Sequence, residues 1–285
     1  MKIMVTGARG LLGQEVIRAL LERGHACLGV SSADFDLCDA AATRRAVSDW
    51  QPEAIIHCAG YTAVDRAESE PARCMVVNSL GTLNLVRAAL RADAKLLYVS
   101  TDYVFDGSGD APRETGAPTG PLNVYGLSKL QGEETVRALM TKFFILRTSW
   151  MFGMGGGNFV RTMLCLGSER PRVNVVCDQF GAPTYAPDLA QLICQIIESS
   201  RYGVYHGTNE GCCSFAEFAN AIMQQGGRRC QVTPIPSSAY PCAARRPLNS
   251  RLSKRSLDLA GFRRLPPWED ALARYLTELK NHNKL

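Results

Sequence analysis

The sequence contains no long hydrophobic run, no Cys-x-x-Cys pair and only four histidines among its 285 residues. No apolar stretch approaches the ~20 residues needed to cross a bilayer, so we expect no membrane span. The N-terminal apolar run is too short for a signal peptide and leads straight into a glycine-rich segment. The eleven cysteines are scattered and odd in number, which predicts reduced thiols in a cytoplasmic protein and no metal site built from cysteines.

A strong excess of one charge is also missing. The 32 basic and 27 acidic residues leave a net charge of +5, too small to indicate nucleic-acid binding but compatible with an anionic small molecule. The histidines lie far apart, so we expect structural rather than catalytic roles for them. Apolar residues at 46% and charged residues at 21% are ordinary for a globular chain that can bury a large core.

The first half alternates short apolar runs with longer amphipathic segments. Apolar runs predict strands at 2–7, 26–30, 54–60, 95–101 and 142–150, and amphipathic segments predict helices at 11–25, 40–50, 75–92 and 123–140. Strands that are apolar throughout belong in a sheet covered on both faces. The alternation therefore predicts an α/β fold, a Rossmann-type doubly wound parallel sheet.

The regular alternation of predicted strands and helices ends near residue 148, where a glycine-rich loop begins. The segments there are less regular, and Ser214 with Glu217 forms a capping box that predicts a helix start. We therefore expect residues 1–147 to form the first domain and residues 148–285 a smaller C-terminal domain. One segment of the second half is expected to return to the sheet of the first.

Three glycines, Gly7, Gly10 and Gly13, lie directly between the first predicted strand and the first predicted helix. In that context the first permits a tight turn, the second lets the backbone approach a pyrophosphate, and the third allows close contact between helix and sheet. The amide groups at the start of the helix then face the anion. The spacing predicts a dinucleotide-binding loop.

Tyr125 and Lys129 are four residues apart in a predicted helix, so their side chains share one face. Such a pair is either a plain surface pair or a proton donor beside the cation that lowers its pKa. The pair alone leaves both interpretations open. Thr101, at the end of the fourth predicted strand, adds a hydroxyl at the edge where ligands bind in these sheets.

Together these motifs resemble the extended short-chain dehydrogenase/reductase superfamily, in which Tyr-x-x-x-Lys and a nearby hydroxyl are catalytic. The chain is also similar to the dTDP-4-dehydrorhamnose reductase family at residues 61–71, 100–107, 121–129, 147–153, 178–184 and 244–253. This resemblance implies reduction of the 4-keto group of dTDP-4-dehydro-6-deoxy-L-mannose, a dTDP-4-keto-6-deoxyhexose. NADPH or NADH would supply the hydride, and the product would be dTDP-L-rhamnose.

The resemblance also implies roles for individual residues. Tyr125 would donate the proton, Lys129 would lower its pKa and hold the nicotinamide ribose, and Thr101 would bond the developing oxyanion. The first domain would bind the dinucleotide and the second the nucleotide sugar. The implied cofactor residues are Gly7, Arg9, Gly10, Leu11, Leu12, Gly13, Asp36, Leu37, Ala59, Gly60, Tyr61, Tyr125 and Lys129. The implied substrate residues are Thr62, Val64, Thr101, Asp102, Trp150 and Arg246.

Plainer interpretations of several of these residues remain open. Thr62 and Val64 fit ordinary loop packing, and Trp150 fits a core position equally well. Asp36 and Leu37 fit a turn before a helix capped by Asp39. The basic segment 243–255 fits a solvated face, although arginine forks such as that of Arg246 suit a diphosphate.

The end of the second predicted strand bears on which nicotinamide is used. Folds selective for NAD place an acidic residue there, whereas this chain offers Val30, Ser31 and Ser32, with Asp34 too far along. Arg9, in the glycine loop, either meets a 2′-phosphate or points to solvent. We therefore predict that NADPH works at least as well as NADH.

Three other functions were compared with this one: a dehydratase, a reductase of another sugar and a regulatory subunit. Dehydratases of the superfamily carry Thr-Asp-Glu after the fourth strand, and the Thr-Asp-Tyr here argues against dehydration. A reductase of another dTDP-4-keto-deoxysugar, and a non-catalytic dinucleotide-binding subunit resembling the methionine adenosyltransferase beta subunit, stay open. Some members of the family are described as magnesium-linked dimers, which allows a homodimer here. One glutamate, Glu15, does not make a metal site, so the sequence gives no support for Mg²⁺.

Overall fold

A computed structural model describes residues 1–283 and contains a central parallel sheet of six strands. The strand order is β10-β5-β4-β3-β1-β2. The strands are β1 (Lys2–Thr6), β2 (Ala26–Val30), β3 (Ala54–His57), β4 (Lys95–Thr101), β5 (Phe143–Thr148) and β10 (Gly203–His206). All pairings in this sheet are parallel, which confirms the predicted doubly wound fold. The sixth strand, β10, comes from the second half of the chain and pairs with β5.

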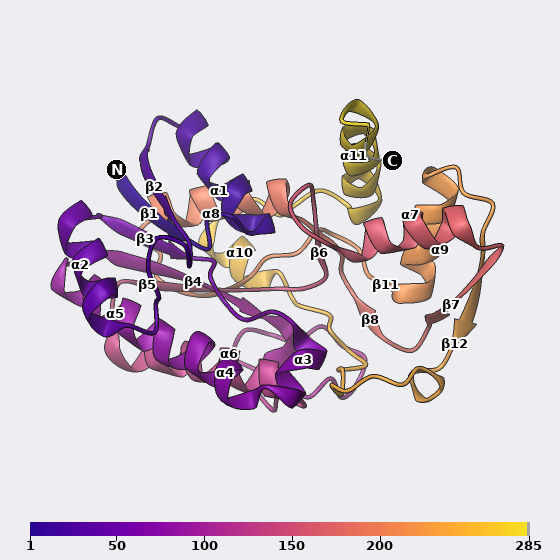
Figure 1. Ribbon diagram of the computed structural model, residues 1–285, viewed down its shortest axis with the longest axis horizontal. Helices are drawn as coiled ribbons and strands as arrows, with labels where there is room; N and C mark the ends of the chain where they lie inside the picture. The colour runs from indigo at the N-terminus through magenta and orange to yellow at the C-terminus, as the bar shows by residue number, and fades with distance from the viewer. Residues whose placement is uncertain (284–285) are drawn as a thin grey trace.

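Helices cover both faces of the sheet, and alternate strand residues face them (Figure 1). Ile3 and Val5 pack with α1 (Leu11–Glu22) and α8 (Ala186–Glu198), which lie above the sheet in the view. Met4, between them, packs on the opposite face with α2 (Ala40–Trp50), α5 (Gly81–Arg91) and α6 (Val124–Leu139). Burial on both faces explains why these strands are apolar throughout.

The segment predicted as one helix over 75–92 is interrupted. It consists of α4 (Pro71–Met75), a π-helical turn η1 (Val76–Leu80) and α5, and it follows the short helix α3 (Val64–Ser69). A π-turn inserts an extra residue into the helical ladder, and such turns often occur at functional sites. Periodicity did not reveal it, because one inserted residue barely alters an apolar pattern.

The second half forms a smaller unit beside the sheet, seen at the right of Figure 1. Its helices are α7 (Phe159–Glu169), α9 (Phe215–Gln225) and α11 (Trp268–Asn281), and α10 (Arg255–Ala260) lies near β10. Its short strands pair as β12 (Gln231–Ile235) with β7 (Arg172–Val176), β11 (Cys213–Ser214) with β8 (Phe180–Gly181), and β6 (Met151–Phe152) with β9 (Thr184–Tyr185). The predicted capping box of Ser214 and Glu217 opens α9. No helix within residues 1–283 is both long and apolar enough to cross a membrane.

Candidate active site

The predicted site residues gather at the carboxyl edge of the parallel sheet. Thr6, His57 and Thr101 end β1, β3 and β4, so the loops that follow these strands lie side by side. In an open parallel sheet this edge is where ligands bind. His57 itself is buried between the hydroxyls of Thr6 and Thr82, and burial lowers its pKa to about 3. It is therefore a neutral structural residue.

The glycine loop after β1 has no room for a side chain at Gly7 or Gly13. Gly7 has φ +69°, and a Cβ there would lie 2.7 Å from the backbone nitrogen of Ala59. A Cβ on Gly13 would lie 2.2 Å from the carbonyl oxygen of Gly7. Helix α1 begins at Leu11 with Gly10 as its N-cap, and no side chain caps its first amides. These amides are therefore available to an anion such as a pyrophosphate.

A second glycine loop, from the other half of the chain, packs over this helix start. A Cβ on Gly155 would lie 2.9 Å from the Cα of Leu11. The side chain of Leu11 is 3.8 Å from the Cβ position of Gly153. From the sequence this loop was noted only as the point where the alternation of strands and helices ends. Its close approach to α1 required the fold.

The loop after β3 is held by Asn78 of η1, a residue that the sequence analysis missed. The backbone nitrogen of Tyr61 donates to Asn78 Oδ1 at 2.7 Å, and Asn78 Nδ2 donates to the carbonyl of Tyr61 at 3.0 Å. The same amide donates to Ser128 Oγ at 2.9 Å, and Ser128 donates to the carbonyl of Tyr125 at 2.7 Å. Asn78 thus ties the loop of Ala59, Gly60 and Tyr61 to the helix that carries Tyr125.

Helix α6 is anchored at both its start and its middle. Asn123 caps it by accepting from Gly126 N at 2.8 Å, so the helix begins at Val124. Further along, Glu133 is fully buried and pairs with the buried Arg147 of β5 at 2.6 Å. Glu133 also accepts from Ser100 of β4 at 2.6 Å. These contacts fix the helix against the strands that end at the site.

Tyr125 and Lys129 lie on the side of α6 that faces the sheet edge, so the plain surface pair is excluded. Lys129 is buried, and its Nζ lies 4.0 Å from the ring centroid of Tyr98 and 3.9 Å from the position of a Cβ on Gly60. Tyr125 is partly buried and meets Tyr103 edge to face, with ring centroids 5.9 Å apart. Lys129 therefore sits toward β3 and Tyr125 toward the end of β4.

The pKa of Tyr125 differs from the expectation. Burial raises it, the charge of Asp102 raises it further, and the hydroxyl of Thr101 opposes the shift. That Lys129 lowers this pKa stays a prediction; in this structure the lysine charge acts on His57 and Cys58 at the end of β3. Burial also lowers the pKa of Lys129 to about 8, against the opposing charge of Glu133.

Thr101 and Asp102 form a buried polar pair beside Tyr125. Thr101 Oγ1 donates to Asp102 Oδ1 at 3.0 Å and accepts from Tyr103 N at 3.2 Å. The expected donation by Thr101 to an oxyanion therefore requires its hydroxyl to turn away from Asp102. Asp102 is 3% exposed, burial raises its pKa to about 6, and its Oδ2 has no hydrogen-bond partner within residues 1–283. A buried oxygen without a partner suits a ligand hydroxyl.

Trp150 projects from the end of β5 into the second half. Its backbone has φ +47°, an uncommon conformation for a bulky residue. The indole stacks on Phe215 with ring centroids 3.6 Å apart, and a Cβ on Gly181 would lie 2.7 Å from its Cε2. Thr184 N donates to the Trp150 carbonyl at 3.1 Å. The second half therefore sets the position of this side chain, and strain of this kind is common at ligand sites.

The other predicted substrate residues are less enclosed. Thr62 is exposed, and Val64 is half-buried at the start of α3. Arg246 forms a two-point ion pair with Asp65, at 2.6 and 3.0 Å, and Asp65 also accepts from Ala244 N at 3.1 Å. In this structure Arg246 therefore docks its segment onto α3, and meeting a diphosphate would require it to share or leave Asp65.

The loop after β2 differs from the prediction in one respect. The expectation that no acid lies at the strand end is wrong, because Asp34 folds back and accepts from both the backbone nitrogen and the hydroxyl of Ser31 at 2.8 Å. The exposed Arg9 contributes to lowering the pKa of Asp34, after those hydrogen bonds. Asp36 is exposed and accepts from Cys38 N at 2.9 Å, and Leu37 lies beside it.

Asp39 caps α2, as the sequence predicted. No group of three or more His, Cys, Asp or Glu side chains in the described part of the chain is placed to hold a metal ion. Glu15 instead pairs with Arg18 one helical turn away.

Comparison with known proteins gives full-length matches. A family model described as RmlD substrate binding domain matches residues 1–281. A dTDP-4-dehydrorhamnose reductase of Streptomyces griseus is 40% identical over 276 residues, which cover 94% of this chain and 91% of that protein. The spore coat polysaccharide biosynthesis protein SpsK of Bacillus subtilis (strain 168) is 37% identical over 277 residues, 97% of each chain. A crystal structure of dTDP-4-dehydrorhamnose reductase from Bacillus anthracis str. Ames in complex with NADP has a TM-score of 0.95 and 39% identity, and covers 97% of this chain and 99% of that one.

Proposed function

The chain belongs to the family described as RmlD substrate binding domain, and from this membership we infer that it reduces the 4-keto group of dTDP-4-dehydrorhamnose with NADPH or NADH. The product is dTDP-L-rhamnose. We propose that Tyr125 donates the proton, that Thr101 and Asp102 contact the sugar, and that Lys129 serves the cofactor side. The relative named for this activity is similar along more than nine-tenths of both chains, including the substrate half.

The residues at the glycine loop fit a dinucleotide. A Cβ at Gly7 or Gly13 would collide with backbone, and the first amides of α1 have no side-chain cap. When bound, the reduced nicotinamide supplies a hydride to the keto carbon. The residues proposed to hold the dinucleotide are Gly7, Arg9, Gly10, Leu11, Leu12, Gly13, Asp36, Leu37, Ala59, Gly60, Tyr61, Tyr125 and Lys129. We propose that residues 1–147, with the returning β10 and its helix α8, carry most of this binding, and that residues from 148 onward supply most of the sugar site.

The observation that carries the proposal is the meeting of Tyr125, Thr101 and Asp102 at the sheet edge. Burial raises the pKa of Tyr125, so the phenol keeps its proton at neutral pH. An alkoxide is a stronger base than a phenolate, so the developing 4-oxygen takes that proton readily. Asp102 Oδ2 has no partner within residues 1–283 and can accept a sugar hydroxyl, and we propose that Trp150, which stacks on Phe215, lines the site from the second half.

Two alternatives share part of this site. A reductase of another dTDP-4-keto-deoxysugar would use the same groups, so only the product distinguishes it. A regulatory subunit has no use for a buried, unpaired carboxylate oxygen beside a tyrosine that retains its proton. The free state of all eleven cysteines supports a cytoplasmic location.

The test is an assay of the purified protein with NADPH and dTDP-4-dehydrorhamnose, followed by NMR of the product. We expect NADPH oxidation that depends on the keto sugar, and dTDP-L-rhamnose as the product. The C4 epimer of that product would indicate a different sugar reductase. Binding of NADPH without turnover of any dTDP-4-keto sugar would favour the regulatory subunit.

A further inference from the structure

Residues 247–253, called here the crossing segment, bond to both halves of the molecule next to the substrate site. Asn249 N donates to the carbonyl of Gly107, in the loop that follows Asp102, at 3.1 Å. On either side of Asn249, Phe180 N donates to the carbonyl of Leu248 at 2.8 Å and Ser250 N donates to the carbonyl of Phe180 at 2.7 Å. The segment therefore connects the loop after β4 with β8, the strand that contacts Trp150.

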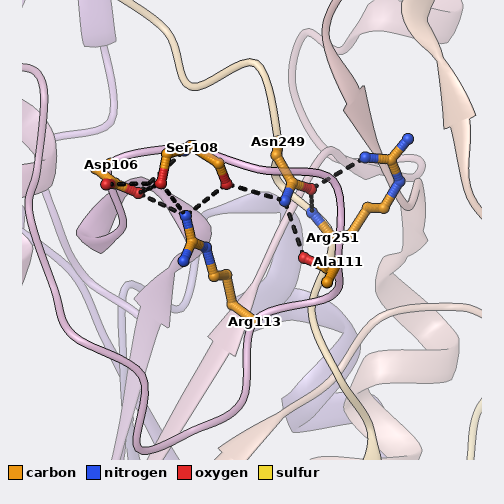
Figure 2. A network of polar contacts seen from close by, with 6 residues as sticks. All are labelled: Asp106, Ser108, Ala111, Arg113, Asn249 and Arg251. Atoms are coloured by element: carbon orange, nitrogen blue, oxygen red, sulfur yellow. Dashed lines mark hydrogen bonds and ion pairs between the residues drawn. The ribbon is translucent and has the colours of Figure 1, made fainter.

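The side chain of Asn249 is the centre of this connection (Figure 2). It is 2% exposed, and its Nδ2 donates to the carbonyls of Ala111 at 2.9 Å and Ser108 at 3.4 Å. Its Oδ1 accepts from the backbone nitrogen and from Nη1 of Arg251, both at 3.2 Å. Each polar atom of this amide is therefore occupied, which defines both its own rotamer and the course of the 106–111 loop.

The loop that Asn249 holds is stiffened from its other side. Arg113 Nη2 donates to Asp106 Oδ1 at 2.7 Å and to the carbonyl of Ser108 at 2.5 Å, as Figure 2 shows. Gly107 adopts φ +71°, and a Cβ there would lie 2.4 Å from Cβ of Pro247. The crossing segment thus presses directly on the backbone that leads out of Asp102.

The crossing segment is buried where it passes the loop that follows Asp102. Ser250 is 4% exposed, next to Asn249 at 2%. Asp102 Oδ1 accepts a hydrogen bond from the hydroxyl of Thr101. A shift of the crossing segment would therefore move the loop that follows Asp102.

We propose that Asn249 is a positioning residue for the substrate half of the site, and that it acts by holding the 106–111 loop, and through that loop Asp102, in place. Asn249 does not touch the reacting atoms. The inference rests on the proposed function, because it assigns Asp102 to the sugar. A displacement of about 1 Å in a positioned group can cost on the order of 10²-fold in rate.

The experiment compares Asn249→Ala with Asn209→Ala. Asn209 is also buried, at 0% exposed, and its amide bonds Tyr185 N, Asp188 and the carbonyl of Pro266, none of which belongs to the crossing segment or to the 106–111 loop. We expect Asn249→Ala to lower kcat/KM for the dTDP-4-keto sugar by about 10- to 100-fold with little change in the Kd for NADPH. Asn209→Ala should lower thermal stability comparably and leave kcat/KM close to wild type.

Two further measurements address the route from Asn249 to Asp102. In an Asp102→Asn background the added effect of Asn249→Ala should largely disappear, since the group that it positions is already altered. Arg251→Met, at a half-exposed position, removes the guanidinium from Asn249 Oδ1, the carbonyl of Asp110 and the ring of Phe180, and should give a smaller loss in the same direction. Equal kcat/KM for Asn249→Ala and Asn209→Ala, a parallel loss of NADPH binding, or an undiminished effect in the Asp102→Asn background would each overturn the proposal.

Amide hydrogen exchange separates this proposal from the proposed function. Exchange at residues 102–111 should increase in Asn249→Ala and not in Asn209→Ala, whatever substrate the enzyme uses. If the wild-type protein does not reduce the dTDP-4-keto sugar, the proposed function fails while this comparison still tests the positioning by Asn249.

Discussion

At the scale of single residues, the two titratable side chains of the site, Tyr125 and Lys129, lie in different environments. Tyr125 lies near a carboxylate, which with burial raises the pKa of the phenol, and Lys129 lies among aromatic and thiol groups, where burial lowers its own pKa. A phenol that retains its proton suits an enzyme that reduces a ketone, because the reaction consumes a proton at that position. The lysine then limits the useful pH range.

The pKa of Lys129 predicts a fall of activity in alkaline solution. Because that pKa is about 8, the ammonium loses its charge as pH rises through 8, and we expect kcat/KM for NADPH to fall over the same range. Lys129→Arg, whose guanidinium stays charged to above pH ~12, should move this fall upward by more than a unit, as a pH–rate profile measures. If the pH–rate profile of Lys129→Arg is unchanged, the alkaline fall in kcat/KM is caused by the titration of another group.

The same shift has a consequence for stability. The unfolded chain, with an ordinary lysine pKa of 10.5, binds more protons at this group than the folded chain does between about pH 8 and 10.5. Stability rises with pH wherever the unfolded state binds more protons. The contribution of Lys129 to the free energy of unfolding therefore increases across that window.

Arg9 and Asp34 together bear on the choice between NADPH and NADH. Asp34 places a negative charge at the end of β2, and Arg9 is the nearby cation that would meet a 2′-phosphate. Arg9→Ala should raise the KM for NADPH more than the KM for NADH, and Asp34→Ala should lower the KM for NADPH, in steady-state assays with each cofactor. Equal effects of Arg9→Ala on both cofactors would remove the arginine from this explanation.

Residues whose chemistry depends on short spacing were visible in the sequence. Gly7 and Gly13 were recognised from their position between a predicted strand and a predicted helix. Tyr125 and Lys129 were recognised from their four-residue spacing within one predicted helix. Asp65 and Arg246 are 181 residues apart, and no local pattern connects them. The direction of the pKa of Tyr125 also needed the fold, because burial raises it and the nearby charge of Asp102 raises it further.

At the scale of elements, the helices and strands of the first half were predicted almost completely, since an apolar strand and an amphipathic helix each have a distinct period. The exceptions are the short helices α3 and α4, which were not predicted, and η1, where the expected continuous helix contains a π-turn. That turn places Asn78 between the loop after β3 and α6, and so between the cofactor side and the catalytic helix.

The position of Asn78 predicts that its truncation affects both stability and cofactor binding. Asn78→Ala would leave the buried partners at Tyr61 and Ser128 unsatisfied, at a cost of about 1–3 kcal/mol in the free energy of unfolding for such a group. We expect a lower Tm and a higher Kd for NADPH, measured by thermal denaturation and titration calorimetry. Asn209→Ala serves again as the control, and the account of η1 would be wrong if both variants bound NADPH like the wild type.

At the scale of the whole molecule, the two halves meet at the site. Strand β10 and helix α8 return from the second half to the sheet, and the crossing segment connects the loop after Asp102 to β8. The parallel sheet was predictable, because its strands carry their own signal. The path of residues 247–253 was not, because an irregular segment has no period and its hydrogen bonds depend on partners more than a hundred residues away.

The measurement that tests the central claim most directly is turnover by Tyr125→Phe. This change removes the hydroxyl that the account makes the proton donor and keeps the ring that meets Tyr103. With NADPH and dTDP-4-dehydrorhamnose, kcat should fall by about 10² to 10⁴, the usual value of general acid catalysis, while the Kd for NADPH stays close to wild type. Reduction of the keto sugar by this variant at a rate near that of the wild type would contradict the assignment of Tyr125 as the acid.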